Sequence, residues 1–269
     1  MKLQGRTAVV TGAAGGVGRA IAKSLARRGC HLALTDIDDA ALERTAAEIA
    51  APGLRVSRHR LDVSDAEAIT AFPGRVTAEH EGADVLINNA GVALAGTFEQ
   101  VSAADFEWLF GINFWGVVRM TRAFLPLLHK SDDARLVNIS SLFGLIAPPG
   151  QTAYVASKFA VRGFSESLRH ELGGTRIGVT VVHPGGVATS IAKHARLPKG
   201  MPLAEIVEKR KSFDSFLRMP PEVAGETIVR GVENRKLRIL VGSDAKRASL
   251  IERLMPVTYW NFLGRGFGK

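Results

Sequence analysis

The stretch TAVVTGAAGGVGRAIAKSLARRG, residues 7–29, decides the fold of this chain. It begins with five apolar or β-branched residues, continues through a glycine-rich loop, and ends with apolar residues at helical spacing. The order of strand, glycine loop and helix is typical of a dinucleotide-binding turn. The glycines permit a tight bend and let backbone N–H groups at the helix N-terminus approach a pyrophosphate. A glycine turn that serves packing alone is the simpler alternative.

The glycines of this loop are consistent with two spacings. Gly12, Gly16 and Gly18 fit G-x-x-x-G-x-G, whereas Gly12, Gly15 and Gly18 fit G-x-x-G-x-x-G. The loop alone does not choose between them. We predict that this part of the chain contacts a cofactor through Gly12, Gly15, Gly16, Val17 and Gly18.

The rest of the chain alternates strand and helix signals almost throughout. Near-continuous apolar strands separated by helices predict a parallel sheet that is covered on both faces. We therefore expect an α/β protein with a Rossmann-type, doubly wound parallel sheet of about seven strands, in a single domain of residues 1–269. The expected strands are residues 7–11, 32–35, 85–87, 136–139, 179–182 and 237–241, with a weaker run at 54–63, and the expected helices are 17–28, 38–50, 65–79, 102–129, 154–172 and 221–233.

Two segments depart from this alternation. Residues 191–219 carry Pro198, Gly200 and Pro202 and are too long for an ordinary connection, so we expect a helical substrate lid there. The C-terminal tail, residues 253–269, mixes aromatic and basic residues. Packing over the site or against a neighbouring subunit is the first expectation for this tail. Weak peripheral contact with a membrane is the second.

Composition and charge narrow the class of protein. With 46% hydrophobic and 23% charged residues, the chain has an ordinary globular composition. The only cysteine, Cys30, excludes a disulfide framework and a cysteine-built metal site, and we expect no metal. The sequence MKLQGRTAVVTG at the N-terminus has no signal-peptide pattern, and we expect a cytoplasmic location.

The formal net charge of +9 raises the question of a nucleic-acid partner. The cations are spread along the chain, and residues 209–211 form the one tight cluster. A solvated surface with attraction for an anionic cofactor explains the excess better than a nucleic-acid-binding face does. We therefore expect no nucleic acid.

Asp36 ends the second expected strand, twenty residues after Gly16. A carboxylate at this point accepts hydrogen bonds from adenosine ribose hydroxyls and repels a 2′-phosphate. Ile37 follows it, and Ala13 and Ala14 in the loop offer no cation for such a phosphate. NAD is therefore predicted in preference to NADP. The alternative is that Asp36 only caps the next helix.

A further group of residues lies in SLFGLIAPPGQTAYVASK, residues 141–158. Tyr154 and Lys158 are four residues apart and share a helix face. A neighbouring ammonium stabilises a phenolate and lowers the tyrosine pKa toward the range of a general acid or base. Ser141 precedes a loop rich in glycine and proline that could fold its hydroxyl back on the phenol. A tyrosine and a lysine at this spacing are common by chance, so the rest of the pattern decides their meaning.

Together these residues resemble the short-chain dehydrogenase/reductase family over nearly the whole chain. TGAAGGVG is similar to that family's T-G-x-x-x-G-x-G, which favours the spacing of Gly12, Gly16 and Gly18. The other matching elements are Asp62 and Val63 for the adenine, NNAG with Asn89, Ala90 and Gly91 after the fourth strand, Asn113 on a helix, and Pro184, Gly185, Val187 and Thr189 for the carboxamide end of a nicotinamide.

The resemblance implies an oxidoreductase that transfers a hydride between NAD(H) and a secondary alcohol or ketone. Tyr154 would be the general acid or base, Lys158 would lower its pKa and bond the nicotinamide ribose, and Ser141 would hold the substrate oxygen. Asn113 would hold a water that links Lys158 to solvent. The active serine of the family stands thirteen residues before the tyrosine, which favours Ser141 over Ser140.

Largely apolar residues around the catalytic set favour an uncharged, hydrophobic substrate. The resemblance also implies a homodimer or homotetramer. Two alternatives stay open, namely an NADP(H)-dependent carbonyl reductase of the same family and a protein that senses a dinucleotide without chemistry. We interpret His183, at the end of a strand, as a histidine held by backbone hydrogen bonds and do not assign it to the site.

Overall fold

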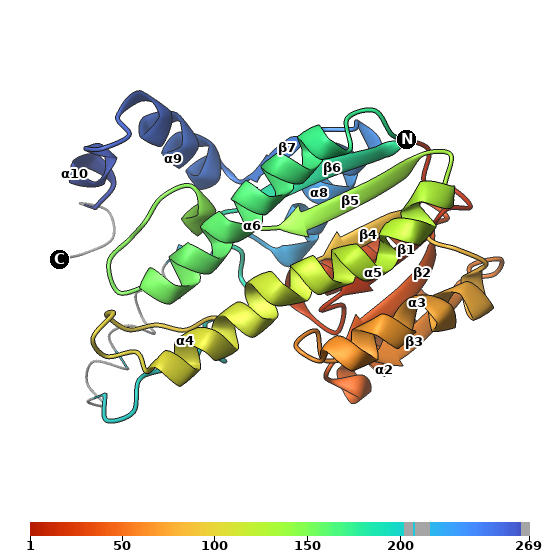
Figure 1. The fold of residues 1–269 in the computed structure, drawn as a ribbon, viewed down its shortest axis with the longest axis horizontal. Coiled ribbons are helices and arrows are strands. Elements are labelled where there is room, and N and C mark those ends of the chain that lie inside the picture. The colour runs from red at the N-terminus through yellow and green to blue at the C-terminus, as the bar shows by residue number, and fades with distance from the viewer. Residues whose placement is uncertain (202–206, 208–215, 265–269) are drawn as a thin grey trace.

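A computed structural model describes residues 1–201, 207 and 216–264 of the protein (Figure 1). The sheet has seven parallel strands in the order β3-β2-β1-β4-β5-β6-β7. The strand order changes direction between β1 and β4, where a doubly wound sheet leaves a crevice at its carboxyl edge. The predicted α/β class and strand number are confirmed. The strands are β1 (Thr7–Thr11), β2 (His31–Asp36), β3 (Val56–Arg60), β4 (Val85–Asn88), β5 (Ala134–Ile139), β6 (Ile177–Pro184) and β7 (Arg238–Val241).

Helices cover both faces of the sheet, and each face has its own apolar core (Figure 1). Ile21, Leu42 and Ile228 pack on one face from α1, α2 and α8. Phe72 of α3 and Phe124 of α5 pack on the other face with ring centres 5.4 Å apart. Strands covered on both faces have continuous rather than alternating apolar runs. The helices are α1 (Gly16–Ala26), α2 (Asp39–Ile49), α3 (Ala66–His80), α4 (Ala103–Phe110), α5 (Gly116–Lys130), α6 (Thr152–Glu171), α8 (Pro221–Glu233), α9 (Ser243–Leu254) and α10 (Tyr259–Leu263).

The helix predicted over residues 102–129 is present as one continuous helical segment, residues 103–130, but it is not α-helical throughout. A π-helical turn, Gly111–Trp115, separates α4 from α5. Within this wider turn Asn113 is fully buried, and its side chain bonds the backbone of Val92. Gly116 follows the turn, and a Cβ at this position would lie 3.0 Å from the carbonyl oxygen of Val63. Helical periodicity does not reveal a local change of turn of this kind.

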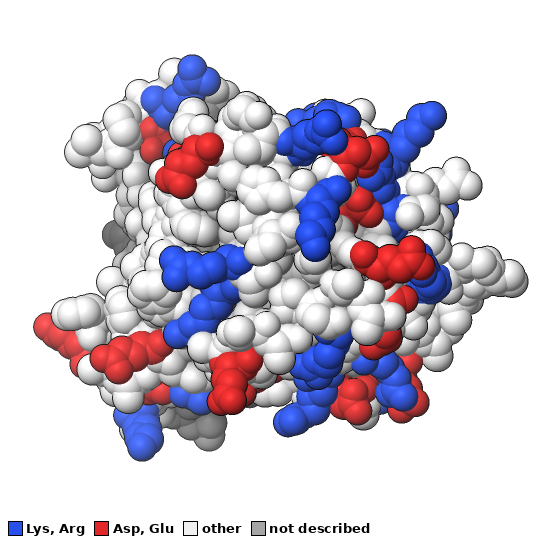
Figure 2. Space-filling model, turned by 45° about the vertical axis from the view of Figure 1, so that its right-hand side comes forward, with Lys and Arg blue, Asp and Glu red and all other residues white. Residues whose placement is uncertain are grey.

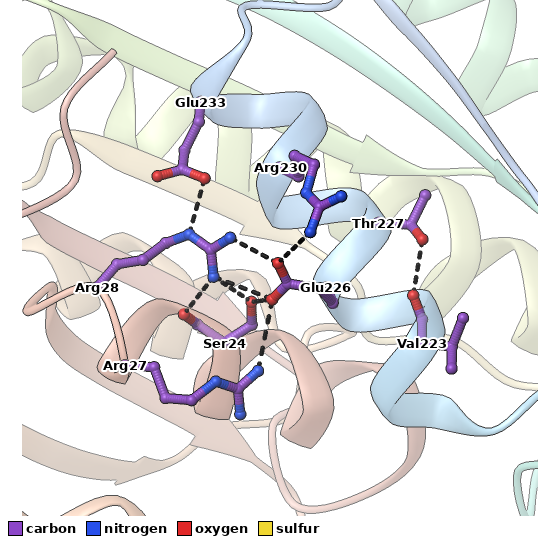
Figure 3. Close-up of polar contacts among 8 residues, drawn as sticks. All are labelled: Ser24, Arg27, Arg28, Val223, Glu226, Thr227, Arg230 and Glu233. Carbon is purple, nitrogen blue, oxygen red and sulfur yellow. Dashed lines mark hydrogen bonds and ion pairs between the residues drawn. The ribbon is translucent and has the colours of Figure 1, made fainter.

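A cluster of charged side chains joins α1 to α8 (Figure 3). Glu226 of α8 accepts hydrogen bonds from Ser24 Oγ at 2.8 Å and from two guanidinium nitrogens of Arg28 at 2.7 and 3.0 Å. Arg28 Nε also donates to Glu233 at 2.7 Å. Gly225 permits the close approach of the helices, since a Cβ there would lie 2.6 Å from the backbone of α1. The cluster fixes α8 against the helix that follows the glycine loop.

The predicted lid and tail are described only in part. Of the lid, residues 202–206 and 208–215 lie outside the described residues, as do residues 265–269 of the tail. The tail residues that are described include α10, which lies with α9 at the upper left of Figure 1. Tyr259 of α10 accepts a hydrogen bond at its hydroxyl from the Ala147 amide at 3.0 Å, so the tail packs on the loop that follows Ser141.

No helix in the described part of the chain has the length and apolar character that a membrane crossing requires. Figure 2 shows one face of the molecule, on which Lys and Arg are interspersed with Asp, Glu and uncharged residues. On that face the cations do not merge into a continuous basic surface. The distribution there fits a solvated surface.

Candidate active site

A cleft of about 690 Å³ lies at the carboxyl ends of the strands. Its walls come from the loops after β1, β2, β3, β4, β5 and β6, which a parallel sheet brings to one edge. Of the predicted site residues, only Gly18 and Asn113 are outside its lining. The predicted residues that line it are Gly12, Gly15, Gly16, Val17, Asp36, Ile37, Asp62, Val63, Asn89, Ala90, Gly91, Ser141, Tyr154, Lys158, Pro184, Gly185, Val187 and Thr189.

Sterics distinguish the two possible glycine spacings. A Cβ on Gly18 would lie 2.0 Å from the Gly12 carbonyl oxygen, and a Cβ on Gly12 would lie 2.8 Å from Ala90 Cα. Gly16 has a left-handed φ of +51°. Gly15 has an extended φ of −160° and open space around it. The fold therefore requires glycine at positions 12, 16 and 18 but not at position 15. Helix α1 begins without a side-chain cap, which leaves its first N–H groups for an anion.

Asp36 ends β2 with its side chain at the cleft. One carboxylate oxygen accepts from the Ala14 amide at 2.9 Å and the other from the Asp38 amide at 3.1 Å. The cap of α2 is Asp38, whose carboxylate accepts from the Ala41 amide at 3.0 Å. This arrangement removes the alternative in which Asp36 only caps that helix. The neighbouring Ile37 is 57% exposed.

The loop after β3 contributes Asp62 and Val63 to the cleft. The Leu61 amide donates to the Asp36 carbonyl at 3.0 Å, which holds this loop beside β2. Asp62 Oδ1 accepts from the amide and the hydroxyl of Ser64 at 2.8 and 2.7 Å. These bonds fix the backbone next to Asp36.

The loop after β4 is tied to the glycine loop. The Asn89 side-chain amide donates to the carbonyl oxygens of Thr11 and Gly12 at 3.0 and 3.1 Å. The Thr11 hydroxyl in turn accepts from the backbone amides of Asn89 and Ala90 at 2.9 and 3.0 Å. In the structure Asn89 therefore holds two walls of the cleft together.

The adjacent serines Ser140 and Ser141 have different surroundings. The Ser140 hydroxyl is buried and donates to the Lys158 carbonyl at 2.8 Å. Ser141 lines the cleft, its Oγ accepts from the Phe143 amide at 3.1 Å, and its side chain lies close enough to Tyr154 to lower the pKa of that phenol. Of the two serines, Ser141 is therefore the one placed for chemistry at the phenol.

Tyr154 and Lys158 lie one turn apart on α6, and burial favours the neutral form of both. It raises the pKa of Tyr154, and the hydrogen bond with Ser141 opposes this rise. It lowers the pKa of Lys158 to about 8. Lys158 Nζ donates to the Ile139 carbonyl at 3.2 Å and lies 5.6 Å from the centre of the Tyr154 ring. The expected net lowering of the tyrosine pKa is therefore wrong for the chain alone, because desolvation outweighs it.

Asn113 supports the cleft from the π-helical turn. Its Oδ1 accepts from the Val92 amide at 2.8 Å, and its Nδ2 donates to the Val92 carbonyl at 3.0 Å and to Ser157 Oγ at 3.2 Å. A Cβ on Gly91 would lie 3.2 Å from this Oδ1 and 3.4 Å from Lys158 Nζ, so both groups flank that glycine. The Asn113 side chain thus positions Val92. The water between Lys158 and solvent stays a prediction.

The loop after β6 reaches the glycine loop. Thr189 Cγ2 lies 3.1 Å from the place that a Cβ on Gly16 would take. Asp244, at the start of α9, accepts from the Gly186 amide at 2.7 Å and fixes this loop. Sequence reasoning missed Asp244, because Gly242-Ser243-Asp244 indicates a helix start without indicating its partner.

Aromatic side chains form further walls of the cleft. Phe143 lies edge-on to Tyr154 and stacks on Phe216, with ring centres 6.2 Å apart in both pairs. Trp108 also lines the cleft, and the Arg196 guanidinium lies 3.5 Å from the centre of its ring. Arg196 donates to a carboxylate of α4 at 3.1 Å as well. Sequence reasoning did not assign Trp108 or Arg196 to the site, because no motif signals a contact between two separate segments.

The arrangement of these motifs is matched by a known protein family. The family model described as short chain dehydrogenase matches residues 6–199. The chain belongs to the short-chain dehydrogenase/reductase family. The protein of Mycobacterium tuberculosis named "Putative oxidoreductase SadH" is 42% identical over 271 residues, which is 99% of this chain and 96% of that protein. UcpA, an oxidoreductase of Salmonella typhimurium, is 39% identical over 193 residues, or 71% of this chain and 73% of that protein. The resemblance inferred from the motifs is confirmed.

Solved structures of family members share the fold. A short-chain dehydrogenase/reductase from Burkholderia phymatum in complex with NAD has a TM-score of 0.87 at 29% identity, over 94% of this chain and 95% of that one. A metagenomic short-chain oxidoreductase in complex with NADP has a TM-score of 0.72 at 30% identity, over 90% and 98%. The protein is therefore an oxidoreductase of a family whose solved members bind NAD or NADP.

Proposed function

We propose that this protein transfers a hydride between NAD(H) and an apolar secondary alcohol or ketone. The observation that supports the proposal is one cleft with two complementary ends. One end has the glycine loop, the uncapped start of α1 and Asp36, which fit a pyrophosphate and a ribose. The other end has Ser141 beside Tyr154, with Lys158 one turn further along α6.

Each reacting side chain has one task in this proposal. A bound nicotinamide would supply or accept the hydride. Tyr154 Oη would give a proton to the substrate oxygen in reduction and take it in oxidation. The Ser141 hydroxyl would hold that oxygen and stabilise the charge that develops on it. Lys158 would bond the nicotinamide ribose and place a positive charge near the phenol as it ionises. Pro184, Gly185, Val187 and Thr189 would hold the carboxamide end.

A substrate screen tests the reaction. Secondary alcohols and ketones of increasing apolar size are incubated with NAD(H), and the absorbance of the reduced ring is followed. The apolar walls around Phe143, Phe216 and Trp108 predict turnover that favours apolar substrates over charged ones. Cofactor binding without turnover of any substrate would instead support a dinucleotide-sensing protein.

The position of Asp36 supports NAD over NADP, because a 2′-phosphate would meet its negative charge. We expect the Kd of NAD to be lower than the Kd of NADP by about tenfold or more. Asp36→Ala should reduce the ratio of these two Kd values by about tenfold, which corresponds to about 1.4 kcal/mol. Titration of both cofactors measures the ratio. Asp39→Ala is the matched control, since Asp39 lies in the first turn of α2, does not line the cleft and should leave the ratio unchanged. Tighter binding of NADP by the unaltered protein would contradict the preference.

The proposal also covers location and assembly. We propose a cytoplasmic homodimer or homotetramer whose tail packs on the fold near the site. Weak membrane contact is the second proposed role of the tail, where Leu254 and Val257 are 71% and 88% exposed beside Arg253. Light scattering measures the assembly. Sedimentation of full-length and tail-deleted protein with anionic vesicles measures the membrane contact, and equal sedimentation of the two would remove it.

A further inference from the structure

His183 is fully buried at the carboxyl end of β6, against the backbone of Ser141. Its Nδ1 lies 2.9 Å from the Ser141 carbonyl oxygen. A carbonyl oxygen only accepts hydrogen bonds, so Nδ1 carries the proton and donates it. Nε2 is then a bare acceptor, and within the described residues it has no partner. A buried acceptor without a partner costs stability, so the residue calls for an explanation beyond packing.

The bond acts on the short turn that presents the serine hydroxyl. The Ser141 carbonyl also accepts from the Gly144 amide at 3.0 Å, which closes the turn Leu142–Gly144. Two donors on one carbonyl oxygen restrict the rotation of that peptide more than one donor does. Because the Gly144 bond survives the loss of the imidazole, such a loss should tilt the serine rather than unfold the turn.

We propose that His183 is a positioning residue, which donates Nδ1–H to the Ser141 carbonyl and thereby fixes the Ser141 hydroxyl against Tyr154. The proposal rests on the proposed function of that pair. Burial lowers the pKa of His183 to about 3, so the imidazole stays neutral and keeps this one tautomer at working pH. The interpretation of His183 as a strand-end histidine bonded to backbone was right, and the identity of its partner adds the role.

Three variants test the role. His183→Phe keeps a ring and removes the donor, while His183→Asn returns an N–H close to the place of Nδ1. His80→Phe is the matched control. His80 is likewise buried, bonded through one ring nitrogen to Ser57 at 2.7 Å and without a partner at the other within the described residues, but it does not line the cleft.

We expect His183→Phe to lower kcat about tenfold, because the hydrogen bond that positions Ser141 is lost. The KM for NAD should change less than about threefold, because the cofactor-binding residues are unchanged. His183→Asn should regain most of kcat. His80→Phe should lose stability but keep its kcat per folded molecule. Equal kcat per folded molecule in His183→Phe and His80→Phe would overturn the proposal.

A second measurement needs no substrate. The chain has two tyrosines, so the phenolate absorbance of the protein minus that of Tyr154→Phe reports the titration of Tyr154 alone. The hydrogen bond from Ser141 lowers the pKa of Tyr154, and its loss should raise that pKa in His183→Phe and not in His183→Asn. This result would stand even if the proposed reaction were not found. A Tyr154 titration that His183→Phe leaves unchanged would overturn the role of His183.

Discussion

Two groups of ionisable side chains in this molecule have pKa values shifted for opposite reasons. In one group ion pairs favour the charged forms, and in the other burial favours the neutral forms. In the cluster between α1 and α8, each charge has partners of the other sign (Figure 3). The Arg28 guanidinium lowers the pKa of Glu226 to about 2, and Glu226 in turn raises the pKa of Arg28. In the cleft, burial alone lowers the pKa of Lys158 to about 8, and burial raises that of Tyr154.

The difference shows how ionisable side chains serve stability in one place and chemistry in another. Paired charges stay ionised across the whole physiological range and hold two helices in place. Within the described residues Lys158 has no ionic partner, and burial without one shifts a pKa toward the neutral form, so a ligand or a transition state changes the charge of such a group more easily. The α1–α8 cluster thus stabilises the scaffold, whereas the charge of Lys158 is available to what binds in the cleft.

The largest expected effect is on kcat and comes from a change at Tyr154 in the cleft. Tyr154→Phe removes one hydroxyl and should lower kcat about a thousandfold, because the proton donor or acceptor is lost. The affinity for NAD should change less than about threefold, since the ring and Lys158 remain. Steady-state kinetics and cofactor titration measure both. Turnover within tenfold of the unaltered protein would show that Tyr154 is not the acid or base.

A second experiment measures the cost of burying the Lys158 charge. The pKa of Lys158 is lowered from 10.5 to about 8, so between these pH values the unfolded chain binds more protons than the folded protein. The free energy of unfolding should therefore rise with pH in that window, by up to about 3 kcal/mol from this group alone. Lys158→Met should abolish this rise and also lower kcat by about a hundredfold or more.

Urea unfolding at pH 7.5 and pH 9.5 tests this expectation. Lys130→Met, at an exposed lysine on the last turn of α5, is the control and should keep the pH dependence of the unaltered protein. If Lys158→Met and the unaltered protein gained equal stability over this range, Lys158 would not be the group that titrates.

The fold and most of the cleft could be predicted, because their signals are local. The continuous apolar run of β1 and the glycine loop after it stand together in the sequence. Asp36, Asn89, Ser141 and Pro184 are each recognisable at or just after the end of a strand, and a parallel sheet brings strand ends to one edge. A local motif for each residue and the topology of a parallel sheet were enough to predict that these residues lie in one cleft.

What escaped prediction depends on contacts between distant segments. The Gly111–Trp115 turn lies in a sequence of good helical period, and only the bonds of Asn113 to Val92 show why it widens. Asp244 of α9 accepts a hydrogen bond from the Gly186 amide in the loop after β6, which is far away in the sequence. The direction of the Tyr154 pKa was wrong because the sequence shows a lysine four residues away but not how strongly the surroundings desolvate the phenol.

The smallest expected effect lies in the paired cluster. Glu226→Gln keeps the shape and some hydrogen bonds but removes the charge that Arg28 meets, and should lower the free energy of unfolding at pH 7 by about 1–2 kcal/mol. The pKa of Glu226 is lowered from 4.5 to about 2, so its contribution is complete above pH 4.5 and is lost as the pH falls toward 2. The variant should therefore lose less stability than the unaltered protein in that acid range.

Chemical unfolding across pH 2.5–7 measures this change, and kcat at pH 7 is measured beside it. Glu48→Gln, at a surface carboxylate that meets Arg19 and Lys23, is the control and should change stability less than Glu226→Gln does. Because the cluster holds helices rather than the reacting end, kcat of Glu226→Gln per folded molecule should stay within about twofold. A larger fall in kcat would mean that the cluster between α1 and α8 also sets the geometry of the glycine loop, and that scaffold and chemistry are not separable here.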